Sequence, residues 1–193
     1  NILKSGGAIM IENPFGGKVA IGSATFVEIG SGGKGIVTAQ HVAEIQSLVP
    51  VSLSVCSFAD MNDCIELNDN YIMDTSESIA TDWAVFEIES FPESAKPAKV
   101  RKRLPPIGEE IIICGIPQGY TPWLSYGYVG YVWLEDNIPI IGVDGFAFFG
   151  SSGGGVYDSE GYLIGVTSAI SASEWGPIED KVLVTPITNI PMF

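Results

Sequence analysis

The sequence is poor in the side chains that metal sites and nucleic-acid-binding surfaces need. Its 193 residues include one histidine, three cysteines and nine basic residues, and charged residues make up only 17% of the chain. No cysteine has a metal-type spacing to a second cysteine and a histidine, so neither a metal nor a cofactor is predicted. The net charge of −14 argues against a nucleic-acid partner, because phosphates are bound by basic surfaces.

Long apolar runs are also missing. None approaches the roughly 20 residues that cross a bilayer, and no stretch resembles a signal peptide, so no membrane segment is expected. Five of the nine basic residues fall in 96–103, and we interpret this stretch as a solvated linker rather than a binding patch.

The three cysteines, Cys56, Cys64 and Cys114, are too few and too scattered to form a disulfide framework. A reducing compartment is therefore the default expectation. A bridge between Cys56 and Cys64 is left open.

What the sequence does have is the composition of a buried, β-rich protein. Hydrophobic residues make up 46%, and 23 glycines and 12 prolines supply turns. Helix signals are confined to 40–48, and the tail 185–192 forms a turn at most. A hairpin turn is predicted at 158–161. Short strands are predicted at 19–29, 35–38, 51–56, 70–73, 83–88, 110–114, 126–134, 138–143, 155–157, 162–168 and 181–184.

The glycine-rich segment Gly150-Ser-Ser-Gly-Gly154 is the first candidate for chemistry. A nucleophilic hydroxyl needs an exposed position beside backbone N–H donors, and flanking glycines let the chain turn sharply enough to supply both. We therefore interpret Ser152 as a nucleophile, with the N–H groups of Gly150 and Ser152 as an oxyanion hole. Ser151 is the weaker choice, because it would place serine rather than glycine in the next position. The alternative is a surface linker, but the apolar residues at 146–149 and 156–157 indicate an ordered loop.

The same segment also satisfies Gly-x-Ser-x-Gly, the nucleophile elbow of α/β-hydrolases. That fold requires a histidine after the serine, and none follows Ser152, so this interpretation is excluded.

His41 and Asp82 complete the set of groups that can activate a serine. His41 is the only imidazole available as a general base, and it lies three positions after the end of the apolar run 35–38. Asp82 opens the apolar run 83–88, where a carboxylate can be partly buried and orient an imidazole. The alternative for Asp82 is an ordinary strand boundary. Other acids, Asp60, Asp63, Asp69, Asp74 and Asp144, are weaker candidates because most lie among loop residues.

The order His41, Asp82, Ser152, with the motifs Gly-Ile-Val-Thr-Ala-Gln-His-Val, Thr-Asp-Trp-Ala-Val and Gly-Ser-Ser-Gly-Gly, resembles the trypsin/chymotrypsin-like serine peptidases. Gly-Ser-Ala-Thr-Phe at 22–26 fits the early strand of that family. The likeness is closest to members without disulfides or activation cleavage, such as HtrA-type and viral proteases. It implies an all-β fold of two six-stranded antiparallel Greek-key β-barrels with few short helices. We expect one barrel at 1–95, a linker at 96–106 and a second barrel at 107–193.

The resemblance also implies a serine endopeptidase that acts through an acyl-enzyme, with His41 as base, Asp82 orienting it and Ser152 attacking the peptide bond. Ser168 matches a serine that supports the aspartate, and 168–170, which includes Ala169, is the expected edge for a substrate peptide.

The pocket for the substrate side chain is expected to have Phe146 and Ala147 as wall and floor. Ile170 would narrow it toward small or medium apolar side chains. Ser151 stands where activated trypsins carry an aspartate, so activation by a freed N-terminus is not expected.

The partner implied by the resemblance is a protein or peptide substrate, such as a polyprotein or a viral or host protein, in a reducing or cytoplasmic setting. The alternative function is a catalytically silent protease fold that serves as a binding or structural module.

Overall fold

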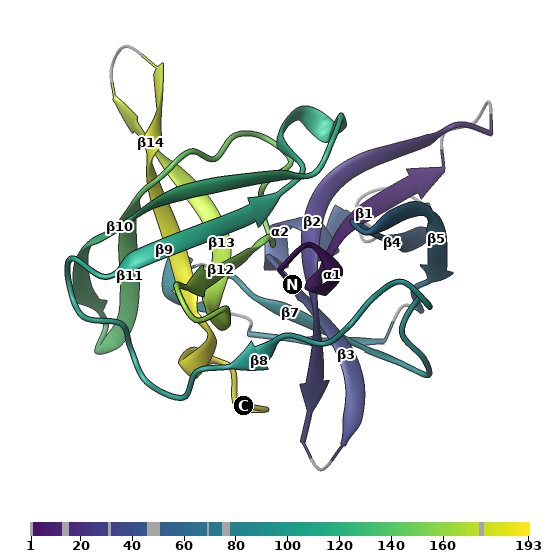
Figure 1. The fold of residues 1–193 in the computed structure, drawn as a ribbon, viewed down its shortest axis with the longest axis horizontal. Helices are drawn as coiled ribbons and strands as arrows, with labels where there is room; N and C mark the ends of the chain where they lie inside the picture. Colours follow the sequence, from purple (N-terminus) through teal and green to yellow (C-terminus); the bar gives the residue numbers. More distant parts are fainter. Residues whose placement is uncertain are drawn as a thin grey trace.

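The computed structural model describes residues 2–12, 16–30, 32–45, 51–68, 70–74, 78–173 and 176–193, and over 171–180 it gives the backbone course alone. In these residues the chain is almost entirely β-structure, arranged as two sheets side by side (Figure 1). This confirms the predicted all-β class with few short helices.

The first sheet uses the N-terminal part of the chain. It has seven strands in the order β5-β4-β1-β2-β3-β7-β6, with all neighbours antiparallel. Strands β2, β3 and β7 carry apolar side chains that form the inner face, because strand residues alternate between the two faces. The bounds are β1 Gly6–Glu12, β2 Lys18–Ile29, β3 Gly33–Thr38, β4 Leu53–Ser57, β5 Asp60–Glu66, β6 Tyr71–Met73 and β7 Ala84–Ile88.

The second sheet is a closed barrel. Six strands run in the order β12-β9-β10-β11-β14-β13, and pairing of β12 with β13 closes the ring. A two-residue strand, β8, adds to β13 in parallel. The bounds are β8 Lys99–Val100, β9 Glu110–Gly115, β10 Trp123–Glu135, β11 Ile138–Asp144, β12 Gly155–Asp158, β13 Tyr162–Ser173 and β14 Gly176–Pro186.

Three strands were not predicted, and each has a physical reason. β1 begins with two glycines, which suggest a turn, yet a Cβ on Gly6 would meet the Phe58 ring at 2.4 Å, so close packing requires glycine there. β5 is rich in Asp and Asn, so Asp60 and Asp63 looked like loop residues. β8 has only two residues and lies in the basic stretch 96–103, which reads as a linker. The first sheet thus has seven strands rather than six, while the division into 1–95, 96–106 and 107–193 stays a prediction.

Helical structure is short. The helix predicted over 40–48 begins at Gln40 as α2 (Gln40–Ala43), and positions 46–48 lie outside the described residues. The other elements are α1 (Ile2–Ser5) and the 3₁₀ turns η1 (Ile79–Thr81), η2 (Pro117–Gly119) and η3 (Ile187–Asn189). The hairpin turn at 158–161 is confirmed, with Gly161 N–H donating to the Asp158 carbonyl at 2.9 Å. No helix among the described residues is long and apolar enough to span a membrane.

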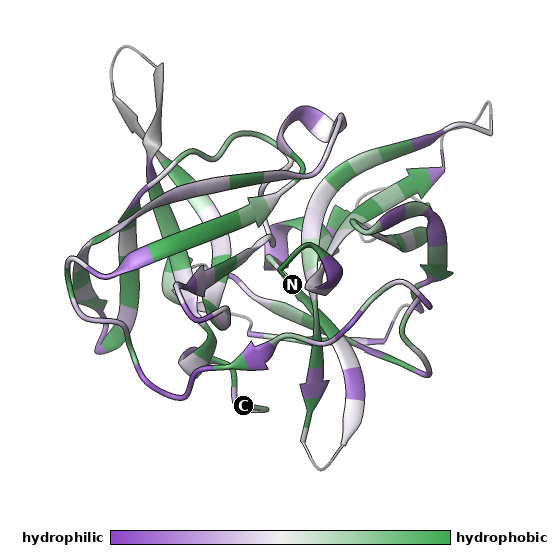
Figure 2. Ribbon diagram, in the orientation of Figure 1, coloured by the Kyte–Doolittle hydropathy of each residue, from purple (hydrophilic) through white to green (hydrophobic). Residues whose placement is uncertain are grey.

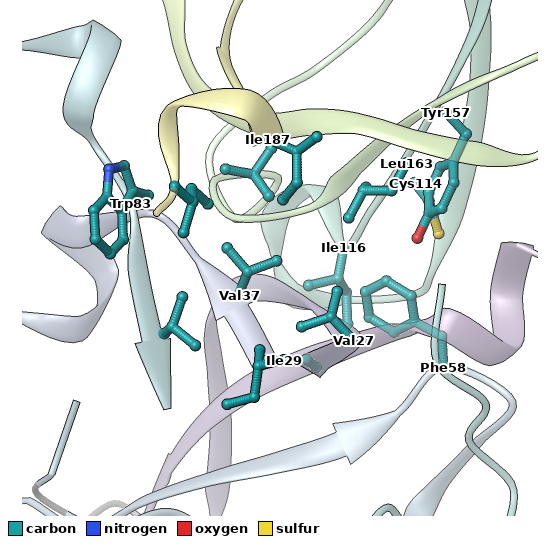
Figure 3. Packing of buried hydrophobic residues seen from close by; sticks show 14 residues of the cluster. Val27, Ile29, Val37, Phe58, Trp83, Cys114, Ile116, Tyr157, Leu163 and Ile187 are labelled. Carbon is teal, nitrogen blue, oxygen red and sulfur yellow. The ribbon is translucent and has the colours of Figure 1, made fainter. Parts of the chain in front are cut away.

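The largest cluster of buried apolar side chains joins the two sheets. Val27, Val37 and Trp83 from the first sheet and its loops pack with Ile116 and Leu163 from the second (Figure 3). Apolar colouring lies mainly on the strands, and polar colouring at turns and strand ends (Figure 2). Each sheet also has an apolar cluster of its own. The shared cluster holds the two sheets in one relative orientation, and this orientation positions the residues at their junction.

One side-chain pairing decides a point that the sequence left open, and another corrects an expectation. Cys56 and Cys64 face each other across β4 and β5 and form a disulfide, while Cys114 is buried and free. Arg101, in the stretch interpreted as a solvated linker, has a side chain only 12% exposed and pairs with Glu109 and Asp158. The linker is therefore attached to the second barrel at this arginine.

Candidate active site

A cleft of about 700 Å³ contains most of the predicted site residues. His41 comes from α2, just after β3, and Asp82 follows η1, so both belong to the N-terminal half. Ser152 lies in the loop between β11 and β12, and Ser168 lies on β13. The cleft is thus shared by the two halves of the fold.

His41 and Asp82 are in direct contact. The imidazole Nδ1 lies 3.0 Å from Asp82 Oδ2 and 3.2 Å from Oδ1, and the backbone N–H of His41 also donates to Oδ1 at 3.2 Å. The carboxylate therefore holds both the ring and the backbone of His41. This leaves Nε2, on the other side of the ring, for the cleft.

Asp82 is held from the second barrel. Ser168 Oγ donates to Asp82 Oδ2. Thr185 Oγ1 donates to the Ile79 carbonyl at 2.6 Å, and Asn189 Nδ2 donates to the Ala80 carbonyl at 2.7 Å, so the η1 turn before Asp82 is anchored as well. Because these contacts cross from one half of the fold to the other, the position of Asp82 depends on the packing of both.

The contact between His41 and Asp82 shifts their pKa values in opposite directions. Burial by itself lowers the pKa of His41, but the hydrogen bond and the charge of Asp82, helped by Glu44, outweigh it, so the net pKa is raised above 6.5. Burial would raise the pKa of Asp82, but the hydrogen bond and charge of His41 and the hydroxyl of Ser168 lower it overall. Asp82 is therefore ionised at neutral pH, and the imidazole is a stronger base than an isolated histidine.

Ser152 lies in the same cleft as His41, but the two are not hydrogen-bonded in the described contacts. Ser152 Oγ instead points to the Ser168 carbonyl, at a distance of 3.5 Å. Such a long contact is weak, so the hydroxyl can rotate at low cost. In structures without substrate, catalytic hydrogen bonds are often long and shorten only in the complex.

The loop at 150–153 has two backbone N–H groups without an acceptor, and they alternate along the chain with two that donate hydrogen bonds. The N–H of Ser151 donates to the Phe148 carbonyl at 2.8 Å, and that of Gly153 donates to the Thr167 carbonyl at 2.7 Å. Among the described residues, the N–H groups of Gly150 and Ser152 have no acceptor in the protein. Two neighbouring free donors beside a hydroxyl form the arrangement that stabilises an oxyanion.

Each carbonyl along this stretch is held in place. The Phe149 carbonyl accepts from Gln118 N–H at 2.6 Å and the Gly150 carbonyl from Ser23 Oγ at 2.7 Å. The Ser151 carbonyl accepts from Gly154 N–H at 2.9 Å and the Ser152 carbonyl from Ser23 N–H at 2.8 Å. Because the N–H of a trans peptide points opposite to its C=O, fixing the carbonyls of Phe149 and Ser151 also fixes the two free N–H groups.

The glycines of the loop are required by its shape. Gly150 has φ +95° and Gly153 has φ +83°, values that other residues rarely adopt. A Cβ on Gly150 would lie 2.5 Å from the Ile116 carbonyl oxygen, and one on Gly153 would lie 2.1 Å from Thr38 Oγ1. The segment is therefore a tightly packed turn, as the sequence predicted, and not a surface linker.

The predicted substrate-binding residues are mostly in the cleft. Ala147, Ser168, Ala169 and Ile170 line it, and so do Thr167, Phe148 and Phe149. Phe146 is not among the lining residues: its side chain is 41% exposed, and its N–H donates to Ser125 Oγ. The structure thus places Ala147 in the cleft lining, but it does not place Phe146 there.

Two positions at the site were missed in the sequence. Ser23 lies in the Gly-Ser-Ala-Thr-Phe stretch but received no role, and its hydrogen bonds to the loop have no local sequence signal. Gln118 adopts φ 57°, which is unusual outside glycine, and nothing in Pro117-Gln118-Gly119 identified it as a partner of Phe149. As for metals, no group of three or more His, Cys, Asp or Glu side chains able to hold an ion occurs in the described part of the chain.

Comparison with known proteins agrees with this geometry. Residues 22–166 match the family Trypsin-like peptidase domain, which is most of the chain, so the chain belongs to that family. The class is that of trypsin-like serine endopeptidases, which are hydrolases. No curated protein sequence matches the chain.

Solved structures with a similar fold include HtrA-type proteases. A variant of the HtrA-type protease AlgW with a tripeptide has a TM-score of 0.71 and 18% identity, covering 96% of this chain and 57% of that one. The variant with a decapeptide has a TM-score of 0.70 and 18% identity, with 95% and 60% covered. AlgW itself with a tripeptide has a TM-score of 0.70 and 18% identity, and the match covers 96% of this chain and 57% of that one. At this identity the likeness shows the fold, and the chain spans less than two thirds of these proteins.

Proposed function

We propose that the chain is a serine endopeptidase in which His41, Asp82 and Ser152 form the catalytic triad. The observation that carries the proposal is that two free N–H groups, on Gly150 and Ser152, lie next to the Ser152 hydroxyl. The same cleft contains the hydrogen-bonded His41 and Asp82. A protease fold that only binds would not need two unpaired donors kept at this point, since unpaired backbone groups cost free energy.

In the proposed reaction, His41 Nε2 takes the proton of Ser152 as Oγ attacks the carbonyl carbon of the scissile peptide bond. The negative charge that develops on the carbonyl oxygen is stabilised by the N–H groups of Gly150 and Ser152. The protonated imidazole, stabilised by Asp82, then gives the proton to the leaving amine. Water, activated by the same imidazole, hydrolyses the acyl-enzyme and frees Ser152.

The substrate is proposed to be a protein or peptide that lies along residues 168–170 and places a small or medium apolar side chain near Ala147 and Ile170. This is supported by their place in the cleft lining, where their neighbours in sequence, Phe148, Phe149 and Ala169, are uncharged and offer no acid to pair with a basic substrate side chain. Within this class, a polyprotein or a viral or host protein is the proposed natural substrate. Cleavage-site profiling on a peptide library tests the side-chain preference, and a preference for arginine or lysine at the scissile bond would contradict it.

Labelling with a fluorophosphonate probe tests the activity without knowledge of the substrate. The wild-type protein is expected to react at neutral pH, whereas Ser152→Ala and His41→Ala are not. Asp82→Asn is expected to keep the fold and to lower turnover by about 10⁴-fold, the effect seen when the orienting carboxylate of a triad is replaced. A folded wild-type protein that stays unlabelled would instead support the silent binding module.

A further inference from the structure

Ser23 is a buried polar residue for which the proposed mechanism has no role. It lies on β2 with none of its surface exposed. Strand β3 pairs with β2 only from Thr25 onward, so at Ser23 the edge of β2 is open. The loop at 150–153 occupies this open edge, and Ser23 makes the contacts that a neighbouring strand would otherwise make.

Four hydrogen bonds connect Ser23 to three segments. Its N–H donates to the Ser152 carbonyl at 2.8 Å, and its Oγ donates to the Gly150 carbonyl at 2.7 Å. The same Oγ accepts from Ile116 N–H at 3.0 Å, and the Ser23 carbonyl accepts from Thr38 Oγ1 at 2.7 Å. The hydroxyl hydrogen and one lone pair are thus both used, which leaves the Oγ little freedom to rotate.

These contacts hold the peptide groups that adjoin the two free N–H groups, because the Gly150 and Ser152 carbonyls belong to the next peptide group after each free N–H. Ser23 holds two of the four carbonyls between Phe149 and Ser152, and its Oγ is the only side-chain donor among the four contacts. It also holds Ile116, directly before the η2 turn that contains Gln118, the donor to the Phe149 carbonyl. One hydroxyl therefore connects the loop with the turn that fixes the Gly150 N–H.

We propose that Ser23 is a positioning residue for the oxyanion hole: its hydroxyl joins Gly150 to Ile116 and keeps the N–H groups of Gly150 and Ser152 directed into the cleft. The residue acts through the backbone and does not touch the substrate. The inference rests on the proposed peptidase function. Since none of the described hydrogen bonds joins Ser23 to His41 or Asp82, its removal should change stabilisation of the oxyanion without changing the base.

The test uses Ser23→Ala and Ser23→Cys, with Ser57→Ala as a matched control. Cysteine is somewhat larger than serine and a weak hydrogen-bonding group, so Ser23→Cys removes the hydrogen bonds without leaving a cavity, whereas Ser23→Ala removes them without adding bulk. Ser57 is also a fully buried serine on a strand of the first sheet, with an Oγ that accepts a hydrogen bond, from Ala59 N–H, and it does not line the cleft.

Fluorophosphonate labelling of Ser23→Ala and Ser23→Cys is expected to be about 10- to 100-fold slower than in wild type, below the loss from deleting a whole oxyanion donor. On a library-selected peptide, kcat should fall by the same factor, with KM within about threefold and the acidic limb of the pH profile unmoved. Ser57→Ala should match wild type in labelling rate.

Each other outcome has a defined meaning. Labelling of both Ser23 variants within about twofold of wild type would overturn the role of Ser23 and leave the proposed function intact. A shifted acidic limb would show that Ser23 acts on the base, and would overturn the inference as well. An unlabelled wild type contradicts the proposed function itself.

Discussion

The Ser168 hydroxyl donates a hydrogen bond to Asp82 Oδ2 across 86 positions of sequence, from strand β13 of the second barrel to the carboxylate that follows η1. The same carboxylate oxygen lies 3.0 Å from His41 Nδ1. The second barrel thus helps to orient the imidazole as well as supplying Ser152. Packing between the two halves and the geometry of the proposed triad are therefore coupled.

Ser168→Ala tests this coupling. Loss of a hydrogen bond to a charged group, with a carboxylate that is less well held, is expected to lower kcat/KM by about 10-fold. Steady-state kinetics on a library-selected peptide measures the effect, with Ser57→Ala as the control. Unchanged kinetics in a folded Ser168→Ala variant would show that His41 and the η1 turn hold Asp82 without Ser168.

The acidic limb of kcat/KM is expected above pH 6.5. The raised pKa of His41 means that the imidazole stays protonated to a higher pH than an ordinary histidine, and only the neutral form can accept a proton from Ser152. Activity should therefore fall as the pH is lowered through this raised pKa. Asp82→Asn removes the carboxylate that raises the pKa of His41, so the acidic limb of the residual activity should lie at lower pH than in wild type. A limb at or below 6.5 in wild type contradicts the prediction.

Gly153 and Gly161 provide a matched pair of left-handed glycines. Both have φ near +84°, but a Cβ on Gly153 would meet Thr38 Oγ1 at 2.1 Å and the Ser23 carbonyl oxygen at 2.2 Å, whereas around Gly161 nothing lies within 4 Å. Gly161→Ala should cost about 1–2 kcal/mol from backbone strain alone.

Gly153→Ala carries the same strain and adds overpacking, for a total of about 2–5 kcal/mol, and it should also abolish probe labelling. Urea unfolding measures both variants. Equal destabilisation of the two would mean that the loop can shift away from β2 without cost.

Arg101 is expected to contribute to stability although it lies in a basic stretch. Its Nη1 is 3.0 Å from Asp158 Oδ2 and its Nη2 is 3.1 Å from Glu109 Oε2, and the Asp158 side chain is only 5% exposed. Arg101→Met would leave the buried Asp158 carboxylate without its charged partner, with only the N–H groups of Glu160 and Tyr162 still donating to Oδ1, at a cost of about 3 kcal/mol. Lys102→Met, at an exposed neighbour, should stay within about 0.5 kcal/mol. Thermal and urea unfolding compare the two, and a similar loss for both would contradict a specific role of Arg101.

The predicted strands were recovered well where apolar side chains alternate or cluster, as in β2, β7, β9 and β13. The prediction failed where other forces decide pairing. β5 is polar but is held at the sheet edge by its backbone ladder with β4, and the glycines of β1 look like a turn, but close packing against Phe58 requires glycine at position 6. These strands have no local signal, because backbone pairing and packing with neighbouring elements stabilise them rather than their own apolar pattern.

By itself the sequence determined which groups are available: a single imidazole at His41, a serine between glycines at 150–154, and enough alternating apolar segments for an all-β fold. Only the tertiary structure decided which N–H groups stay free, that Ser23 holds the loop, and that Arg101 and Cys56 have partners. The reason is that residue type and spacing encode composition and periodicity, whereas hydrogen bonds between β2, η2 and the 150–153 loop exist only once the two halves have packed together.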